Sequence, residues 1–122
     1  MPVSVLVVDD SAMARKMLIR ALPPDWDITV TQVSNGSDAL AHYRQGGVDV
    51  MFLDLTMPEM DGYQVLATLR SEDLNGLVIV VSADIQEAAQ ARVRAMGAIA
   101  FIKKPVDTER VRAVLKEYGL LV

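Results

Sequence analysis

The chain has 122 residues, of which 52% are hydrophobic and 23% are charged, and these values are typical of one soluble globular domain. It has no cysteine, which excludes thiol chemistry and cysteine-based metal sites. The net charge is −4 and no concentrated basic face is visible, so direct nucleic acid binding is not expected. Without a signal peptide or an apolar run of about eighteen residues, we expect no membrane span and a cytoplasmic location.

Short β-branched runs alternate with segments of helical period along the whole chain. The predicted strands cover about 3–8, 28–33, 50–53, 77–81 and 99–102, and the predicted helices cover about 11–22, 37–44, 63–70, 85–96 and 107–118.

Individual residues in these segments have predicted places as well. Ser11 can cap the first helix, and polar residues in the second strand place that strand at a sheet edge. Trp26 is expected to cover the end of the first helix. The inner faces of the first and last helices would include Ala14, Met17, Leu18, Ala21 and Leu22, and Val111, Val114, Leu115 and Tyr118.

Five strand-helix units in this order predict a right-handed, doubly wound α/β domain with a parallel sheet. In open parallel sheets, ligand sites gather outside the carboxyl ends of the strands. Four of the predicted strands end beside residues with useful chemistry: Asp9-Asp10, Asp54, Ser82 and Lys104. We therefore expect one functional site at this edge.

The three carboxylates of that edge would repel one another, by roughly 4 kcal/mol for a pair about 4 Å apart at an effective dielectric near 20. A divalent cation with a preference for oxygen would offset the repulsion, and Mg²⁺ suits carboxylates that leave room for water. With its charge neutralised, Asp54 could attack a phosphoryl group, while Lys104 and the Ser82 hydroxyl contact the phosphoryl oxygens. The product would be an aspartyl phosphate.

Each of these residues also has an ordinary structural interpretation when it is taken alone. Adjacent aspartates after a strand usually cap a helix or lie in a solvated turn, and Ser82 could cap the helix that follows it. Lys104 before a proline would usually be a surface lysine. The functional interpretation depends on all of them meeting at one edge of the sheet.

The segment from Asp54 to Gly62, Asp-Leu-Thr-Met-Pro-Glu-Met-Asp-Gly, resembles the phosphoacceptor loop of bacterial response-regulator receiver domains. The resemblance extends from the first strand to the last helix and includes Ser82-Ala83 and the stretch from Phe101 to Pro105. It implies one receiver domain over residues 1–122 with a (βα)5 flavodoxin-like fold, a three-layer sandwich with strand order 2-1-3-4-5.

The same resemblance implies that Asp10, Asp54 and the backbone carbonyl of Thr56 bind Mg²⁺, with Asp9 acting through a water. A sensor histidine kinase or phosphotransfer protein would phosphorylate Asp54, and the domain would catalyse only its own phosphorylation and dephosphorylation. Ser82 and Phe101 would carry the switch to the surface of the fourth helix, fifth strand and fifth helix. A downstream protein, or an output domain absent from this chain, would read that surface.

Two other functions have sequence features against them. A Mg²⁺-dependent phosphatase with an aspartyl-phosphate intermediate would keep a second acid two residues after its nucleophile, where this chain has Thr56. A degenerate receiver that only binds partners would not need Ser82, Lys104 and the three acids together. The sequence leaves open whether the domain acts alone or as part of a longer regulator.

Overall fold

The computed structural model describes residues 2–74, 76–83 and 86–121. Its strands are β1 (Val3–Val8), β2 (Ile28–Val33), β3 (Val50–Asp54), β4 (Leu77–Ser82) and β5 (Ala100–Lys103). Its helices are α1 (Ala12–Ala21), α2 (Gly36–Gln45), α3 (Gly62–Ser71), α4 (Glu87–Ala95) and α5 (Thr108–Glu117). The described strands form one parallel sheet in the order β2-β1-β3-β4-β5. The predicted fold class and strand order are confirmed.

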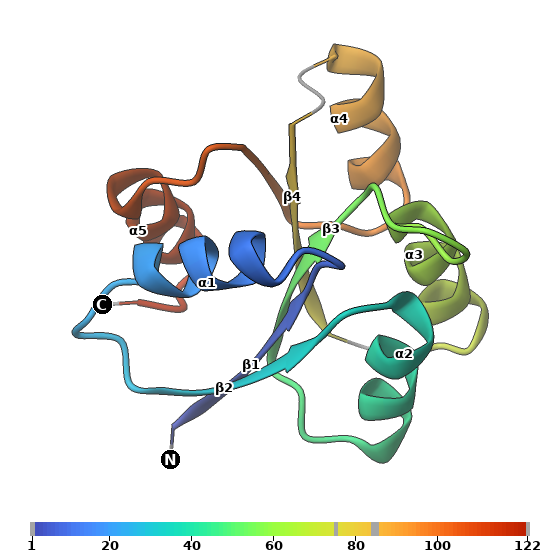
Figure 1. The fold of residues 1–122 in the computed structure, drawn as a ribbon, viewed down its shortest axis with the longest axis horizontal. Coiled ribbons are helices and arrows are strands. Elements are labelled where there is room, and N and C mark those ends of the chain that lie inside the picture. The colour runs from blue at the N-terminus through green and yellow to red at the C-terminus, as the bar shows by residue number, and fades with distance from the viewer. Residues whose placement is uncertain (1, 75, 84–85, 122) are drawn as a thin grey trace.

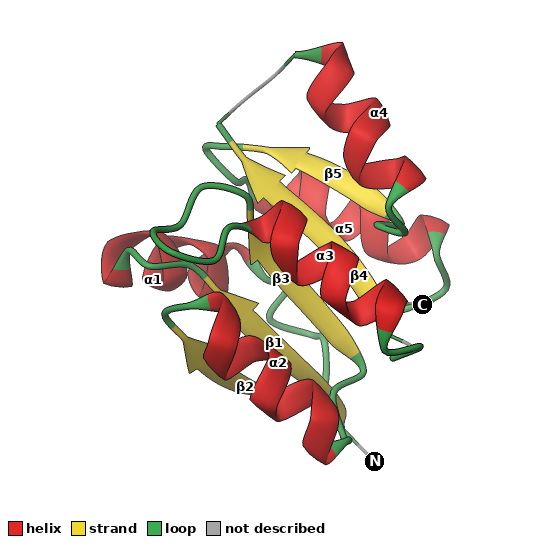
Figure 2. Cartoon of the chain, turned by 90° about the vertical axis from the view of Figure 1, so that its right-hand side faces the viewer, coloured by secondary structure: helices red, strands yellow, loops and turns green. Residues whose placement is uncertain are grey.

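The sheet lies between two helical layers, with α1 and α5 on one face and α2, α3 and α4 on the other (Figure 1). Alternate residues of each strand enter the two cores, as the period of two in a β-strand requires. In β3, for example, Met51 and Leu53 face the α2–α3 side, whereas Val50 and Phe52 face α1 and α5. All strand arrows point to the same edge (Figure 2). That edge carries the predicted site.

The predicted cap at Ser11 and the predicted edge position of the second strand are confirmed. The Ser11 hydroxyl accepts the backbone N–H of Ala14, 3.1 Å away, and thereby caps α1. Asp107 caps α5 in the same way, through the N–H of Arg110. The polar strand β2 does lie at a sheet edge. Among the described helices, none is long and apolar enough to cross a bilayer.

Two side chains differ from their predicted positions. Met17 and Tyr118 were expected on inner helix faces, but they are 51% and 39% exposed. Trp26 is buried in the same core cluster as Leu22, the C-cap residue of α1, and its Nε1–H also donates to the carbonyl of Leu120 at 3.0 Å. The indole therefore connects the α1–β2 loop to the segment after α5.

The fourth helix begins later than predicted. Its expected first residue, Ile85, lies outside the described residues, and α4 starts at Glu87 with Gln86 as its N-cap residue. Ser82 ends β4 and is not the N-cap of α4, so the capping interpretation of Ser82 was wrong.

Replacing Tyr43 with phenylalanine is expected to stabilise the fold by about 1 kcal/mol, because the ring is buried and its hydroxyl has no hydrogen-bond partner among the described residues. Burial, reinforced by the charge of Asp49, raises the pKa of Tyr43 to about 12. Urea unfolding would measure the change, with Tyr118→Phe as a control at an exposed tyrosine. A clear loss of stability in Tyr43→Phe would contradict the prediction.

Candidate metal and phosphoryl site

The carboxyl ends of four strands bring the predicted site residues to one edge of the sheet. Asp9 directly follows β1, Asp54 ends β3, Ser82 ends β4 and Lys104 directly follows β5. The strand register aligns these ends: Val8 pairs with Leu53, Asp54 with Val81, and Ser82 with Lys103. The convergence that the sequence predicted is therefore present.

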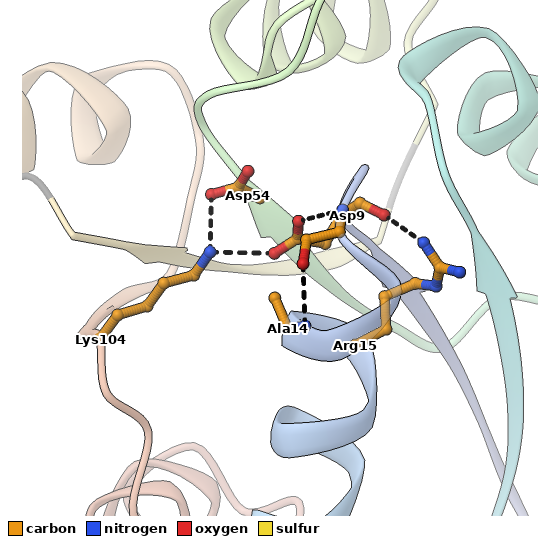
Figure 3. A network of polar contacts seen from close by, with 6 residues as sticks. Asp9, Ala14, Arg15, Asp54 and Lys104 are labelled. Atoms are coloured by element: carbon orange, nitrogen blue, oxygen red, sulfur yellow. Dashed lines mark hydrogen bonds and ion pairs between the residues drawn. The ribbon is translucent and has the colours of Figure 1, made fainter.

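The Lys104 ammonium lies between two buried carboxylates (Figure 3). Its Nζ is 2.9 Å from Asp9 Oδ2 and 3.2 Å from Asp54 Oδ1. Its backbone N–H donates to the Ser82 carbonyl at 2.9 Å, which holds the loop after β5 against the end of β4. Lys104 is therefore part of the acidic site and not a free surface lysine.

The Asp54 carboxylate lies in surroundings that disfavour its charge. Burial, followed by the negative charge of Asp9, raises the pKa of Asp54, although Lys104 and the Thr56 N–H partly oppose the shift. An apolar cavity of about 340 Å³ beside the carboxylate is lined in part by Phe52 and Pro105. Added positive charge at this site would stabilise the ionised form.

The surroundings of Lys104 favour its charged form. Its burial disfavours the ammonium, but the hydrogen bond with Asp9 and the charges of Asp54 and Asp9 outweigh that effect and raise the pKa of Lys104. The lysine consequently stays charged at neutral pH. One ammonium faces two carboxylates here, so the cluster keeps an excess of negative charge.

The acidic residues fit a divalent cation. Asp9, Asp10 and Asp54 each offer a carboxylate oxygen, and these oxygens all lie within 4.8 Å of one another. Carboxylate oxygens are the ligands that Mg²⁺ and Ca²⁺ prefer, and the exposure of Asp10 gives an ion a route from solvent. Thr56 lies beside this group because its backbone N–H contacts Asp54, and its carbonyl as a metal ligand stays a prediction.

Ser82 and Phe101, the predicted switch residues, are both buried. Ser82 lines a pocket of about 250 Å³ together with Thr56 and Tyr63. The Phe101 ring packs in the core between the sheet and α2, α3 and α4. Ser82 is thus placed beside the loop that follows Asp54, and Phe101 is on the neighbouring strand β5.

One side chain at the site was not identified from the sequence. Arg15, on α1, donates from Nη1 to the backbone carbonyl of Asp9 at 2.7 Å and from Nε to Gln32 Oε1 at 3.0 Å. A basic residue in the second turn of an amphipathic helix is an ordinary surface feature. Only the pairing of β1 with β2 shows that Gln32 is near enough to bind it.

Comparison with known proteins agrees with this fold. The family model for the response regulator receiver domain matches residues 5–116. The chemotaxis protein CheY of Listeria monocytogenes is 36% identical over 113 residues, which cover 92% of this chain and 94% of that protein. A protein-glutamate methylesterase/protein-glutamine glutaminase of Halalkalibacterium halodurans is 43% identical over 124 residues, but the match covers only 35% of its length.

Solved structures give the same result. The signal receiver domain of the putative response regulator NarL from Mycobacterium tuberculosis is 35% identical, with a TM-score of 0.84 and 97% of each chain covered. CheY in the CheX-CheY-BeF3-Mg complex from Borrelia burgdorferi is 30% identical, with a TM-score of 0.88, 98% of this chain and 90% of that chain covered. On these matches, the chain belongs to the response regulator receiver domain family and is a phosphoacceptor signalling switch.

Proposed function

We propose that Asp54 accepts the phosphoryl group, and that Asp9, Asp10, Asp54 and the Thr56 carbonyl bind Mg²⁺, Asp9 through a water. The observation that carries the proposal is the Lys104 ammonium held between Asp9 and Asp54 at 2.9 and 3.2 Å. A cation fixed beside a buried, strand-end carboxylate is the arrangement that phosphoryl transfer requires, because this reaction depends on alignment and charge neutralisation.

In the proposed reaction, an Asp54 oxygen forms the new bond to phosphorus. The bond between phosphorus and the donor nitrogen or oxygen breaks, and its electron pair leaves with the donor. Lys104, whose ammonium is 3.2 Å from Asp54 Oδ1, and the Ser82 hydroxyl, on the neighbouring strand β4, would bind the phosphoryl oxygens. Bound Mg²⁺ would supply positive charge that offsets the three carboxylates and the incoming phosphoryl group.

Phosphorylation would act on the surface formed by α4, β5 and α5 through Ser82 and Phe101. A phosphoryl group adds about 1.5 to 2 negative charges and three acceptor oxygens, which would draw the Ser82 hydroxyl toward it. The Phe101 ring could then occupy the space that Ser82 leaves. The few buried residues of α4, Ala89 and Val93, support the proposal because a lightly packed helix is easily repositioned.

The phosphoryl donor in this proposal is a sensor histidine kinase or a phosphotransfer protein, and the site works in the cytoplasm. The domain, residues 1–122, would catalyse only its own phosphorylation and dephosphorylation. The chain spans nearly the full length of the CheY relative but about a third of the methylesterase relative. The switched surface would accordingly act on a separate protein or on an attached output domain.

Incubation with Mg²⁺ and acetyl phosphate is expected to add one phosphoryl group per chain, measured by intact mass, and excess EDTA should prevent the addition. The adduct should then hydrolyse. In a separate assay the protein should not turn over p-nitrophenyl phosphate rapidly, as expected of a switch and not of a phosphatase. No adduct under these conditions would contradict the proposal, whereas rapid multiple turnover would favour the phosphatase.

A further inference from the structure

We propose that Arg15 is a positioning residue for the metal site: it holds the peptide group between Asp9 and Asp10 so that the Asp10 carboxylate faces Asp9 and Asp54. The inference rests on the proposed Mg²⁺ site. Its evidence is the pair of hydrogen bonds from one guanidinium, 2.7 Å to the Asp9 carbonyl and 3.0 Å to Gln32 Oε1 (Figure 3 shows the first of them).

The three carboxylates of the site are held in different ways. Asp54 is fixed by its strand and by Lys104. The Asp9 carboxylate accepts the Ser11 N–H at 2.9 Å and the Lys104 ammonium at 2.9 Å. The Asp10 carboxylate is exposed and has no hydrogen bond or ion pair with any residue that the structure describes. Among the described residues, its own backbone is therefore what restrains where this carboxylate lies.

Arg15 acts on that backbone. The Asp9 carbonyl and the Asp10 N–H belong to one planar peptide group, so a donor that fixes the carbonyl also fixes the plane from which the Asp10 Cα continues. The peptide group before Asp9 is already fixed, because the Asp9 N–H donates to the Val33 backbone carbonyl at 3.3 Å. Arg15 thus completes the restraint on the turn that presents Asp10.

An arginine suits this position better than a lysine. Its planar fork presents several donors in fixed directions, so it can bind the Asp9 carbonyl and Gln32 together, which an ammonium on a flexible stem does less well. The contact to Gln32 anchors the fork to β2. The guanidinium binds the Asp9 backbone carbonyl, so this contact occupies none of the carboxylate oxygens of the cluster.

The decisive variant is Arg15→Met, which keeps a long apolar stem and good helix propensity but removes the donors. Electrostatics alone predicts tighter Mg²⁺ binding, because a positive charge near the site is lost. Positioning predicts the opposite: about a tenfold higher dissociation constant, the lower end of the range for residues that orient metal ligands. Calorimetric titration of the purified chain with MgCl2 would measure it.

Two further variants separate positioning from general damage. Gln32→Leu removes only the anchor and should weaken Mg²⁺ binding by less than the roughly tenfold expected for Arg15→Met. Arg20→Met, on the exposed part of the same helix, removes a positive charge outside the acidic cluster and should leave the affinity unchanged or slightly tighter. At saturating Mg²⁺, the phosphorylation rates of Arg15→Met and wild type should agree within about twofold, because the proposed effect is on binding.

An affinity in Arg15→Met equal to or tighter than that of wild type would overturn the positioning role. So would a rate that stays depressed at saturating Mg²⁺. If Arg15→Met does not fold, Gln32→Leu serves as the test, because Gln32 is exposed and its replacement should not unfold the chain. An unchanged Mg²⁺ affinity in Gln32→Leu would then overturn the positioning role. A wild-type chain that binds no Mg²⁺ at all would instead overturn the proposed metal site on which the inference rests.

Discussion

Asp54→Asn is expected to abolish the phosphoryl adduct formed with acetyl phosphate and Mg²⁺. A carboxylate oxygen is the proposed nucleophile, and the amide that replaces it has neither the charge nor the basicity to attack phosphorus. The amide has nearly the same shape, so the packing at the end of β3 should be kept. Intact-mass measurement would show no added phosphoryl group, and an undiminished adduct would show that another residue is the acceptor.

The same variant should not lose stability when Mg²⁺ is absent. Burial and then the charge of Asp9 raise the pKa of Asp54, so this group favours folding below the usual carboxyl pKa. That contribution is lost as the pH rises through the raised value. Above that raised pKa the charge of Asp54 opposes folding, so replacing the carboxyl with an uncharged amide should leave the free energy of unfolding equal or higher.

Urea unfolding of both proteins with and without Mg²⁺ would test the stability argument. Mg²⁺ should stabilise the wild type more than Asp54→Asn, because a ligand that binds only the folded state stabilises it more when it binds more tightly. Asp27→Asn is a matched control, since Asp27 is an exposed aspartate that precedes β2 at the opposite edge of the sheet. It should keep both the adduct and the response to Mg²⁺.

The parts of this molecule that follow simple physical rules could be predicted from the sequence. The nearly continuous apolar runs at Val5–Val8 and Val50–Leu53 match strands that are buried on both faces. Once those strands are parallel, the residues that follow them must meet at one edge, which is why Asp9, Asp54 and Lys104 could be grouped. The grouping needed no knowledge of side-chain conformation.

Features that depend on side-chain packing could not be predicted in this way. The apolar character of Met17 suggested burial, but helical period does not fix how wide the buried stripe is, and the residue lies at its exposed margin. Trp26 and Leu120 are 94 positions apart, and Arg15 and Gln32 are 17 apart, so no local pattern connects either pair. Their contacts become visible only when the helices are placed on the sheet.

Gly62→Ala is expected to destabilise the fold by about 1 to 3 kcal/mol and to slow phosphorylation of Asp54. A Cβ at this position would lie 2.6 Å from the Asp54 carbonyl oxygen and 2.8 Å from the Leu55 Cα. Both neighbours are backbone atoms and cannot rotate away. Gly62 also donates its N–H to the Leu55 carbonyl at 3.0 Å, so a shift of the first turn of α3 would pull on the segment that follows Asp54.

The sign of the change makes Gly62→Ala informative, because helix propensity alone favours alanine over glycine by about 1 kcal/mol. Gly47→Ala is a suitable control: its φ is +85°, and a Cβ there has no atom within 4 Å. It should cost about 1 kcal/mol from backbone strain with no change in the phosphorylation rate. A Gly62→Ala protein as stable and as reactive as wild type would mean that the start of α3 does not constrain Asp54, so the position of this carboxylate would depend on β3 and Lys104 alone.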